Sequence, residues 1–481
     1  MLAFALPAVV CYGGREKNGD FMIERIFKIL QQNLDPYKVI IDRDILDSYS
    51  RDETPDLTAL PDILVRAENA HDVSTTLKIC SEHKIPVTPR GAGTGVTGGA
   101  LAVMGGVVLS LENCNRILEI DRNNMVAVVE PGAITGAIQK AALEHGLMYP
   151  PDPASLETCS IGGNVAEGAG GPRAVKYGTT KDYILGLEFV LPDGSIMNTG
   201  GKIVKNATGY NLIGILLGSE GTLAVITKIY LKLIPAPKFT LDVLVPFDSL
   251  EQAIDAVYAI LSSRVIPATL EFMEEDAIRL VAKHIQATVA CSDAAAQLLI
   301  QIDGNTEDLV LADLQTIVQA IQVDEDKVFI AQTPSQKERL WKSRRSIRES
   351  IQAESPVFVA EDCVVPRARI PQFVKELKVY FRKKNLRSVM FGHAGDGNVH
   401  IDVLKDDIPY DVWKIMLPDI KGAIYRRALD FGGTITGEHG IGYLRKDYLS
   451  LALSSDEINL SRRIKTAFDP GMILNPGKIF S

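Results

Sequence analysis

The sequence predicts an α+β fold of two or three domains. Its 481 residues are too many for one hydrophobic core. Between residues 57 and 237, glycine-rich loops alternate with short apolar runs, which favours two α/β subdomains around a ligand. After the Pro235-Ala-Pro237 boundary, strand and helix patterns repeat as in a ferredoxin-like α+β domain, and a mainly helical part completes the chain. We therefore divide the chain into an N-terminal segment (1–56), a ligand-binding domain (57–237) and a C-terminal domain (238–481).

Apolar and β-branched runs predict the strands, and amphipathic runs predict the helices. We expect strands at residues 63–66, 107–111, 125–129, 241–247, 298–302 and 327–331. We expect helices at residues 134–145, 249–262 and 308–321. One more helix should be capped by Asp72, with Val73, Leu77 and Cys80 on its apolar side. Gly146 is expected to end the helix at 134–145.

The N-terminal run from Leu2 to Cys11 is apolar, but no basic segment precedes it and no A-x-A site follows it. These absences argue against a secretory signal. Met22 opens a helical pattern, so we hypothesise that translation starts there and that the residues before it are not part of the native protein. An intact N-terminus at Met1, measured by mass spectrometry of protein from the native gene, would contradict this hypothesis.

Composition and charge narrow the function classes. The chain is 46% hydrophobic and 23% charged, which is ordinary for a globular enzyme. A net charge of −9 argues against a nucleic-acid partner, and no apolar run is long enough to span a bilayer. The six cysteines include no Cys-x-x-Cys pair, which excludes a self-contained iron–sulfur site of ordinary spacing and a dense disulfide framework. We expect a cytoplasmic protein, with peripheral attachment to the inner membrane through partner subunits as the alternative.

The segment from Pro86 to Gly99 has glycines at positions 91, 93, 95, 98 and 99. Glycine permits positive φ and close approach of a ligand, and successive N–H groups form an anion-binding concavity, so a phosphate or pyrophosphate is the expected guest. Gly93-x-Gly95-x-x-Gly98 matches the dinucleotide fingerprint, but the loop runs into the strand at 107–111 without room for the required helix. A standard NAD site is therefore not expected.

Further glycine-rich patches follow at Glu130-Pro131-Gly132, Pro150–Pro153, Ile161–Gly171 and Gly218–Leu223. In this order, the patches resemble the FAD domain of the vanillyl-alcohol-oxidase-like (PCMH-type) flavoproteins over residues 57–237. The resemblance implies that the loop at 90–99 holds the FAD pyrophosphate, that 151–171 lines the isoalloxazine and ribityl chain, and that 218–226 lies along the nucleotide. Several members bond FAD covalently to a His in the glycine-rich loop, and Thr94 matches that position, so non-covalent FAD is expected.

The resemblance assigns the following residues to FAD binding: Pro89, Arg90, Gly91, Ala92, Gly93, Thr94, Gly95, Thr97, Gly98, Gly99, Glu130, Pro131, Gly132, Pro151, Asp152, Ser155, Thr158, Ser160, Ile161, Gly162, Gly163, Asn164, Ala166, Gly168, Ala169, Gly170, Tyr177, Gly178, Glu220, Gly221, Ile226 and Asn475.

Three of the seven histidines fall in two glycine-containing segments, Gly392–His400 and Gly437–Gly440. The spacing of His393 and His400 is too long for one helical face and suits a strand end and a loop. These histidines and Glu438 offer the ligand types that Zn²⁺, Mn²⁺ or Fe²⁺ accept, and three protein ligands leave an open catalytic position. Scattered histidines are often only surface or core residues, which is our interpretation of His71, His83, His145 and His284.

The C-terminal half resembles the FAD-linked 2-hydroxyacid dehydrogenases, which include D-lactate dehydrogenases, D-2-hydroxyglutarate dehydrogenases and the catalytic D subunit of glycolate oxidase. The matching motifs are His393-x-Gly-Asp-Gly-Asn-x-His400, Gly-Glu438-His439-Gly and Trp341-x-x-Arg344. The resemblance implies a divalent metal on His393, His400 and Glu438, with Zn²⁺ favoured over Mn²⁺ or Fe²⁺. It implies that His439 is the general base and substrate contact, that Arg344 grips the substrate carboxylate, and that Asn475 lies near the flavin ring.

These roles suit the oxidation of R-CH(OH)-COO⁻. A metal lowers the pKa of the hydroxyl, a histidine accepts its proton, and the arginine fork matches a carboxylate. Arg344 nevertheless lies in a basic run with Lys342, Arg345 and Arg348 that could be a solvated helix face. Arg345 or Arg348 is a candidate second contact to the substrate.

Relatives that oxidise D-2-hydroxyglutarate carry a Thr one turn after the arginine, a downstream Lys, and an Asn two residues after the second metal histidine. The matching positions here are Arg348, Ala360 and Asp402, although Arg348 could replace the missing cation. The segment at 360–371 is more similar to the glycolate and D-lactate enzymes. Glycolate or D-lactate is therefore the favoured substrate, and D-2-hydroxyglutarate is the alternative.

Two other function classes stay open. A metallohydrolase built on the same histidines leaves the glycine-rich half unexplained. A non-catalytic FAD electron-relay subunit would lack His439 or a metal ligand, and none is missing. Without iron–sulfur cysteines, reduced FAD must pass electrons to an FAD or iron–sulfur partner subunit, an electron-transfer flavoprotein, a quinone or a cytochrome.

Overall fold

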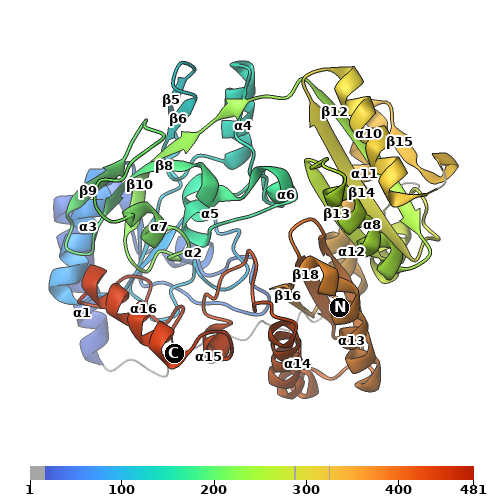
Figure 1. Ribbon diagram of the computed structural model, residues 1–481. Coiled ribbons are helices and arrows are strands. Elements are labelled where there is room, and N and C mark those ends of the chain that lie inside the picture. Colours follow the sequence, from blue (N-terminus) through green and yellow to red (C-terminus); the bar gives the residue numbers. More distant parts are fainter. Residues whose placement is uncertain (1–16, 286–288, 324, 481) are drawn as a thin grey trace. The chain divides into compact units, whose positions relative to one another are not determined.

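The computed structural model describes residues 17–285, 289–323 and 325–480 (Figure 1). The first of two units takes its described residues from 17–169, 180–236 and 439–480, and the second consists of Gly170–Thr179 and Pro237–Glu438. The sequence analysis kept residues 238–481 together, whereas the chain leaves the second unit after Glu438 and rejoins the first unit at His439. The apolar N-terminal run at 2–11, and with it the hypothesis of a start at Met22, lies outside what the described residues can test.

Two sheets organise the first unit. One has the strand order β1-β2-β4-β3, in which β2 and β3 both run parallel to β4. The other is antiparallel with the order β5-β6-β10-β8-β9, and β7 pairs with β11. The strands are β1 (Val39–Ile40), β2 (Ile63–Arg66), β3 (Val87–Arg90), β4 (Val107–Ser110), β5 (Ile117–Asp121), β6 (Val126–Val129), β7 (Leu147–Met148), β8 (Ile184–Val190), β9 (Ile196–Gly200), β10 (Val225–Lys232) and β11 (Ile234–Pro235).

The helices of the first unit are α1 (Lys17–Asn33), α2 (Arg43–Asp47), α3 (Ala70–His83), α4 (Thr135–Glu144), α5 (Ile161–Glu167), α7 (Leu212–Leu216), α15 (Leu449–Ala452) and α16 (Ser455–Phe468). The strands predicted at 63–66, 107–111 and 125–129 are confirmed as β2, β4 and β6, and the helix predicted at 134–145 is confirmed as α4. The glycine-rich segment at 91–106 forms turns and loop without a helix, as expected.

Helix α3 begins earlier than the sequence predicted. Asn69 is its N-cap, because the Asn69 side chain accepts a hydrogen bond from the backbone N–H of Asp72 at 3.0 Å. Asp72 lies inside the first turn, and its carboxylate pairs with the buried Lys38 at 2.9 Å. The apolar side was predicted correctly, since Val73, Leu77 and Cys80 are all fully buried.

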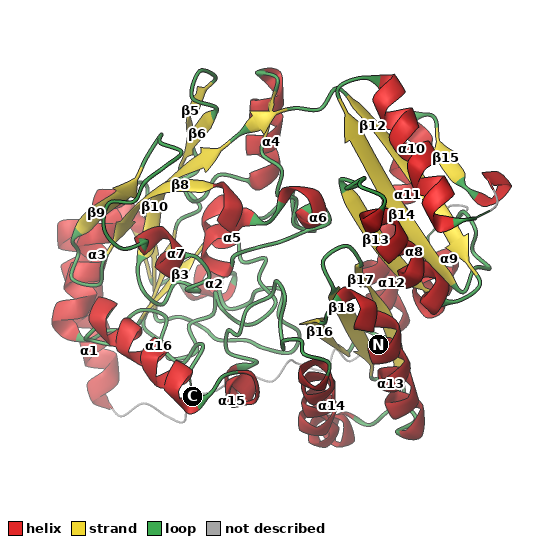
Figure 2. Cartoon of the chain, viewed as in Figure 1, coloured by secondary structure: helices red, strands yellow, loops and turns green. Residues whose placement is uncertain are grey.

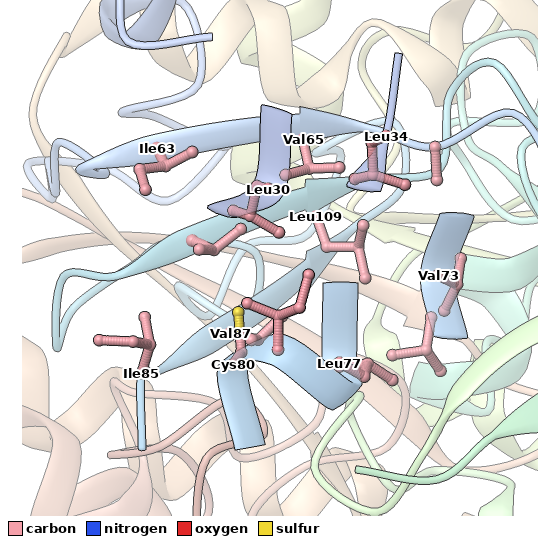
Figure 3. Close-up of a cluster of buried hydrophobic side chains, with 14 of the residues drawn as sticks. Leu30, Leu34, Ile63, Val65, Val73, Leu77, Cys80, Ile85, Val87 and Leu109 are labelled. Atoms are coloured by element: carbon pink, nitrogen blue, oxygen red, sulfur yellow. The ribbon is translucent and has the colours of Figure 1, made fainter. Parts of the chain in front are cut away.

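The core of the first unit lies between its parallel strands and helices α1 and α3. Figure 3 shows Leu30 of α1 and Leu77 of α3 in the cluster that contains Val65 and Leu109 of the sheet. The C-terminal segment completes this core, because Val87 donates to the carbonyl of Ile473 at 2.8 Å and Asn475 donates to the carbonyl of Val87 at 2.7 Å. This pairing explains why residues far along the chain belong to the first unit.

The second unit is built on one antiparallel sheet with the order β15-β12-β14-β13-β17-β18-β16. Its strands are β12 (Phe239–Phe247), β13 (Thr269–Glu274), β14 (Ala296–Gly304), β15 (Phe329–Ala331), β16 (Phe358–Val364), β17 (Arg387–His393) and β18 (Asn398–Leu404). When the first four strands of this unit are numbered along the chain, their order in the sheet is 4-1-3-2. This order confirms the ferredoxin-like arrangement. Helices α8 and α10 pack on β12 and β14 (Figure 2), and β17, β18 and β16 extend the sheet beyond β13.

The helices of the second unit are α6 (Ala174–Tyr177), α8 (Leu250–Ser262), α9 (Glu275–His284), α10 (Glu307–Ile321), α11 (Pro334–Arg345), α12 (Ile347–Glu354), α13 (Ile370–Lys383) and α14 (Tyr410–Asp430). In the described part of the chain, none of the helices combines the length and the apolar character needed to cross a bilayer.

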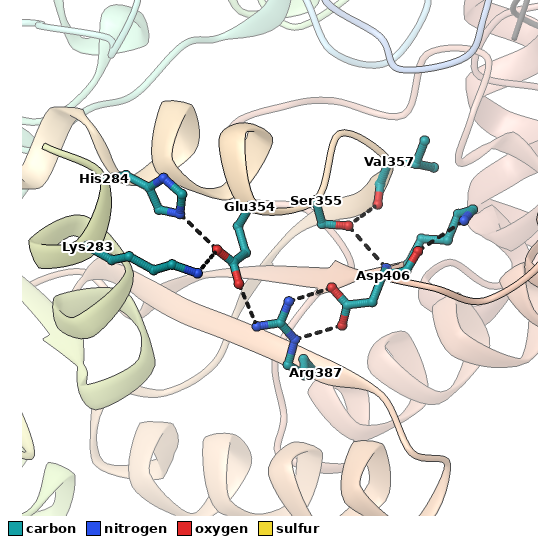
Figure 4. Close-up of polar contacts among 8 residues, drawn as sticks. Lys283, His284, Glu354, Ser355, Val357, Arg387 and Asp406 are labelled. Carbon is teal, nitrogen blue, oxygen red and sulfur yellow. Dashed lines mark hydrogen bonds and ion pairs between the residues drawn. The ribbon is translucent and has the colours of Figure 1, made fainter. Parts of the chain in front are cut away.

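An ion-pair network stabilises the second unit away from the candidate site. Figure 4 shows Glu354 of α12 accepting hydrogen bonds from Lys283 at 2.6 Å, His284 at 2.8 Å and Arg387 at 3.1 Å. Arg387 also binds Asp406 at 2.7 Å. The hydrogen bonds from Lys283, His284 and Arg387 lower the pKa of Glu354 to about 2.

We expect Glu354→Gln to lower the free energy of unfolding by about 1 kcal/mol at pH 7, the upper end for partly exposed pairs. Because the pKa of Glu354 is lower in the folded state, its contribution exists above the ordinary pKa of 4.5 and disappears as the pH falls towards about 2. Thermal unfolding of variant and parent at several pH values measures this difference. Glu338→Gln, which breaks the exposed pair with Arg345, is the control. An equal deficit for Glu354→Gln at pH 7 and near pH 2 would contradict the electrostatic explanation.

Candidate active site

Three of the predicted FAD loops meet at one cavity in the first unit. The cavity has a volume of about 420 Å³ and is lined by Ala92, Glu112, Asn115, Gly132, Ile134, Ala137 and Ser160. Of these, Ala92, Gly132 and Ser160 belong to the predicted set. The backbone N–H of Ala92 donates to Ser160 Oγ at 3.3 Å, and a side chain at Gly91 would overlap that oxygen. The close packing of these loops leaves a space in the size range typical of ligand pockets, about 300–1,000 Å³.

Arg90 holds the glycine-rich loop from inside the protein. Its guanidinium donates to the carbonyl of Arg51 at 2.8 Å and lies 5.6 Å from the ring centroid of Tyr49. Gly93 has a φ of +73°, and a side chain there would collide with the Arg90 guanidinium. The positive φ therefore favours glycine at position 93, and Arg90 reaches the end of the loop by donating to the carbonyl of Ala100 at 3.4 Å.

A second group of predicted residues meets around Glu220. The Asn475 side chain donates to the carbonyl of Gly99 at 2.9 Å and to the carbonyl of Glu220 at 2.8 Å. The Glu220 carboxylate accepts from the backbone N–H of Ile441 at 2.8 Å and of Gly442 at 2.6 Å. Burial raises the pKa of Glu220, and those two N–H donors act in the opposite direction. The segment that starts at His439 is thereby fixed to the glycine-rich loops of the first unit.

Lys478 is a neighbour of this group that sequence reasoning missed. Its ammonium donates to the carbonyl of Leu101 at 2.6 Å and to Asn475 Oδ1 at 2.9 Å. Burial lowers the pKa of Lys478 to about 7. The terminal Asn475-Pro-Gly-Lys478 motif thus binds the glycine-rich loop through both of its polar side chains.

Some predicted FAD residues have other partners. The Glu130 carboxylate binds Arg116, with the shortest contact at 2.7 Å. Gly170, Tyr177 and Gly178 belong to the short segment of the second unit, where Tyr177 donates to the Asp303 carboxylate at 2.6 Å.

The two predicted metal histidines lie on adjacent strands of the second unit. His393 is the last residue of β17, and His400 lies in β18 opposite Phe391. Because side chains alternate along a strand, residues 391 and 393 share a face, and His400 lies diagonally opposite His393 on that face. The His393 and His400 ring nitrogens are 3.5 Å apart, and both side chains are buried.

Glu438 joins this pair from the loop after α14. The buried Asp362 of β16 holds the loop, since its carboxylate accepts from the backbone N–H groups of Gly437 at 2.8 Å and Glu438 at 2.7 Å. Thr436 donates to the same carboxylate at 3.0 Å. Glu438 Oε1 consequently lies 3.4 Å from His393 Nε2.

The resulting cluster fits a divalent cation. The potential ligand atoms of His393, His400 and Glu438 all lie within 4.8 Å of one another. Nδ1 of His393 is 2.6 Å from the buried Glu271 carboxylate, so its Nε2 faces Glu438 and His400. Burial alone would lower the pKa of His393, but the Glu271 and Glu438 carboxylates hold it well above its ordinary value. The two carboxylates place negative charge beside the histidine nitrogens, and a divalent cation with nitrogen and oxygen ligands would balance that charge.

The two predicted substrate arginines each meet a buried carboxylate of the sheet. Arg344 binds Glu271, with Nε at 2.9 Å and Nη2 at 2.7 Å from Oε2. Arg348 lies 3.5 Å from Asp402, two residues beyond His400 in β18. Arg344 is therefore attached to the histidine–glutamate cluster through Glu271, while the charge of Arg348 is balanced by Asp402.

Sequence reasoning missed the carboxylates that support the cluster. Glu271 and Asp362 each lie in a buried strand, and no glycine or histidine beside them marks a site. Their registers place Glu271 opposite His393 and Asp362 opposite His400. A charged residue inside an apolar strand was the only available signal, because a buried charge needs a partner.

Comparisons with known proteins show the family of the chain. Residues 61–200 match the family model described as FAD binding domain, and residues 236–479 match the one described as FAD linked oxidases, C-terminal domain. The chain is 40% identical over 435 residues to the glycolate oxidase subunit GlcD of Bacillus subtilis (strain 168), covering 90% of this chain and 92% of that one. It is 37% identical over 468 residues to a D-lactate dehydrogenase of Anaerostipes hadrus, covering 95% and 97%.

A solved structure of p-cresol methylhydroxylase with substrate bound is similar in fold. The TM-score is 0.77 at 20% identity, and the alignment covers 95% of this chain and 97% of that one. This similarity confirms the predicted PCMH-type fold.

Proposed function

Since the chain belongs to the FAD-linked oxidases, we propose that this oxidoreductase converts a small 2-hydroxyacid, glycolate or D-lactate, to the 2-oxoacid. The observation that carries the proposal is the cluster of His393, His400 and Glu438, with ligand atoms within 4.8 Å of one another and Arg344 attached to it through Glu271. A metal-type donor set beside an arginine suits a substrate that carries a hydroxyl next to a carboxylate. The names of the two relatives point to the same substrates.

In this proposal, Arg344 binds the substrate carboxylate and His439 accepts the hydroxyl proton. His393, His400 and Glu438 hold a divalent ion, Zn²⁺ or else Mn²⁺ or Fe²⁺, which when bound lowers the pKa of the hydroxyl. FAD, held without a covalent bond, supplies the hydride acceptor. The backbone contacts of Glu220 to Ile441 and Gly442 keep the His439 segment against the glycine-rich loops.

The pair of Arg348 and Asp402 favours a monocarboxylate substrate. Asp402 is fully buried and lies 3.5 Å from the Arg348 guanidinium, so the arginine charge is already balanced. A second substrate carboxylate would have to compete with Asp402 for Arg348. This argument supports glycolate or D-lactate over D-2-hydroxyglutarate.

Electrons must then leave the reduced flavin. We propose a protein acceptor, either an FAD or iron–sulfur partner subunit or an electron-transfer protein. The Bacillus relative is named as a subunit, which supports a partner of this kind.

The first test is the visible spectrum of the purified protein, recorded anaerobically before and after separate additions of glycolate, D-lactate, L-lactate and D-2-hydroxyglutarate. We expect a flavin spectrum that glycolate or D-lactate bleaches, and that no longer bleaches after chelation of the metal. Bleaching by D-2-hydroxyglutarate alone would overturn the monocarboxylate assignment. A flavin spectrum that none of the acids changes would favour an electron-relay subunit.

A further inference from the structure

We propose that Glu271 is a positioning residue that fixes the metal ligand His393 and the carboxylate-binding Arg344 in one common geometry. This inference rests on the proposed function. Glu271 lies in β13 directly opposite His393 of β17, and none of its surface is exposed. It is therefore a rigid part of the sheet on which the cluster is built.

The two oxygens of Glu271 serve the two partners separately. Oε1 lies 2.6 Å from His393 Nδ1. Oε2 accepts from Arg344 Nε at 2.9 Å and Nη2 at 2.7 Å. The Glu271 carboxylate thus connects the proposed metal ligand His393 to the proposed substrate-binding Arg344, and it is not itself a ligand of the metal.

For His393, the contact selects the tautomer. A carboxylate can only accept a hydrogen bond, so His393 Nδ1 must carry the proton and Nε2 is left to bind a metal. Nε2 is the atom that faces Glu438 at 3.4 Å and His400 at 3.5 Å. Without Glu271, the ring could take the other tautomer and present N–H to the metal position.

For Arg344, the contact fixes the plane of the guanidinium. Nε and Nη2 are both directed to Glu271, and the carbon of the guanidinium lies 4.8 Å from the ring centroid of Phe391. Phe391 in turn packs against His400, with ring centroids 5.1 Å apart. These contacts leave the Nη1 side of the fork to bind a substrate carboxylate next to the cluster.

The test compares Glu271→Gln with Glu274→Gln. Glutamine keeps the shape of glutamate, but an NH₂ group replaces one of the two carboxylate oxygens. That NH₂ group would face an N–H of His393 or Arg344 and could not accept its hydrogen bond. Glu274 is the matched control, because it is buried in the same strand and binds Lys378 at 2.7 Å and the backbone N–H of Met390 at 3.0 Å. Neither contact involves the cluster.

We expect Glu271→Gln to weaken Zn²⁺ affinity, measured by competition with a chromophoric chelator, by about 10–100-fold. The KM for the bleaching acid should rise as well, while the flavin spectrum stays unchanged. Glu271→Asp should restore part of the metal affinity, because it keeps the charge at a shorter reach. Glu274→Gln should lower thermal stability but leave metal affinity and KM at the parent values.

Two results would overturn the role of Glu271: parental metal affinity in Glu271→Gln, or an equal loss of affinity in Glu274→Gln. Parent protein that binds neither Zn²⁺ nor Mn²⁺ would instead overturn the metal site of the proposed function, and this role with it. Should Glu271→Gln fail to fold, the same comparison is made with Glu271→Ala, which removes the carboxylate, and parental affinity together with parental KM in that variant would overturn the proposal.

Discussion

His439→Ala should lower turnover of the 2-hydroxyacid by about 10²–10⁴-fold, the usual contribution of a general base, while FAD stays bound. The retention of FAD follows from how the segment is held. Glu220 binds the backbone N–H groups of Ile441 and Gly442, and these contacts do not use the imidazole of His439. The measurement is flavin bleaching by the acid, recorded together with the flavin content of the purified variant.

The control for this variant is His145→Ala, an exposed histidine at the end of α4 in the same unit. It should leave both turnover and flavin content unchanged. Near-normal turnover of His439→Ala would remove His439 from the role of base. Loss of flavin from that variant would assign the residue to cofactor binding instead.

The local fold was predictable wherever one face of a strand or helix is buried, because apolar residues then recur at a regular spacing in the sequence. The strand at 63–66 and the helices at 249–262 and 308–321 emerge close to their predicted bounds as β2, α8 and α10. Element boundaries were less certain, and α3 illustrates why. Both Asn69 and Asp72 can cap a helix, and only the backbone geometry decides that Asn69 does so.

Long-range pairing was not predictable from local patterns. The sequence assigned residues 439–481 to the C-terminal domain, but Val87 pairs with Leu474 and brings that segment into the first unit. The extension of the second sheet by β16, β17 and β18 was missed for the same reason. The sequence analysis treated the last part of the chain as mainly helical and expected only a strand end near His393 and His400, whereas three strands form there.

The candidate site divides in a similar way. His393, His400 and Glu438 were identified because histidines are rare in the chain and because His393 and Glu438 stand beside glycines, and the structure places the three ligand groups together. Glu271 and Asp362 carry no such mark, although they orient His393 and the Glu438 loop. Supporting carboxylates of this kind become visible only when the strand register is known.

His400→Ala should remove most of the metal and, with it, turnover. Even the loss of an outer partner of a metal ligand costs about 10–100-fold in metal affinity, so the loss of one of three protein ligands should cost more than about 100-fold. His400 is buried between Phe391 and His393. After truncation neither neighbour can replace the lost ligand, because Phe391 has no ligand atom and His393 already serves as one. Metal content by elemental analysis and bleaching of the flavin by the acid measure the two effects.

His284→Ala provides the control for the truncation itself, since His284 lies in the same unit but binds Glu354 rather than the cluster. It should keep parental metal content and turnover. Added Zn²⁺ should restore bleaching to chelated parent protein and to chelated His284→Ala, but not to His400→Ala at the same concentration, because only that variant lacks a ligand. Full metal content and parental turnover in His400→Ala would exclude His400 as a metal ligand, and with it this cluster as the site of the metal that turnover uses.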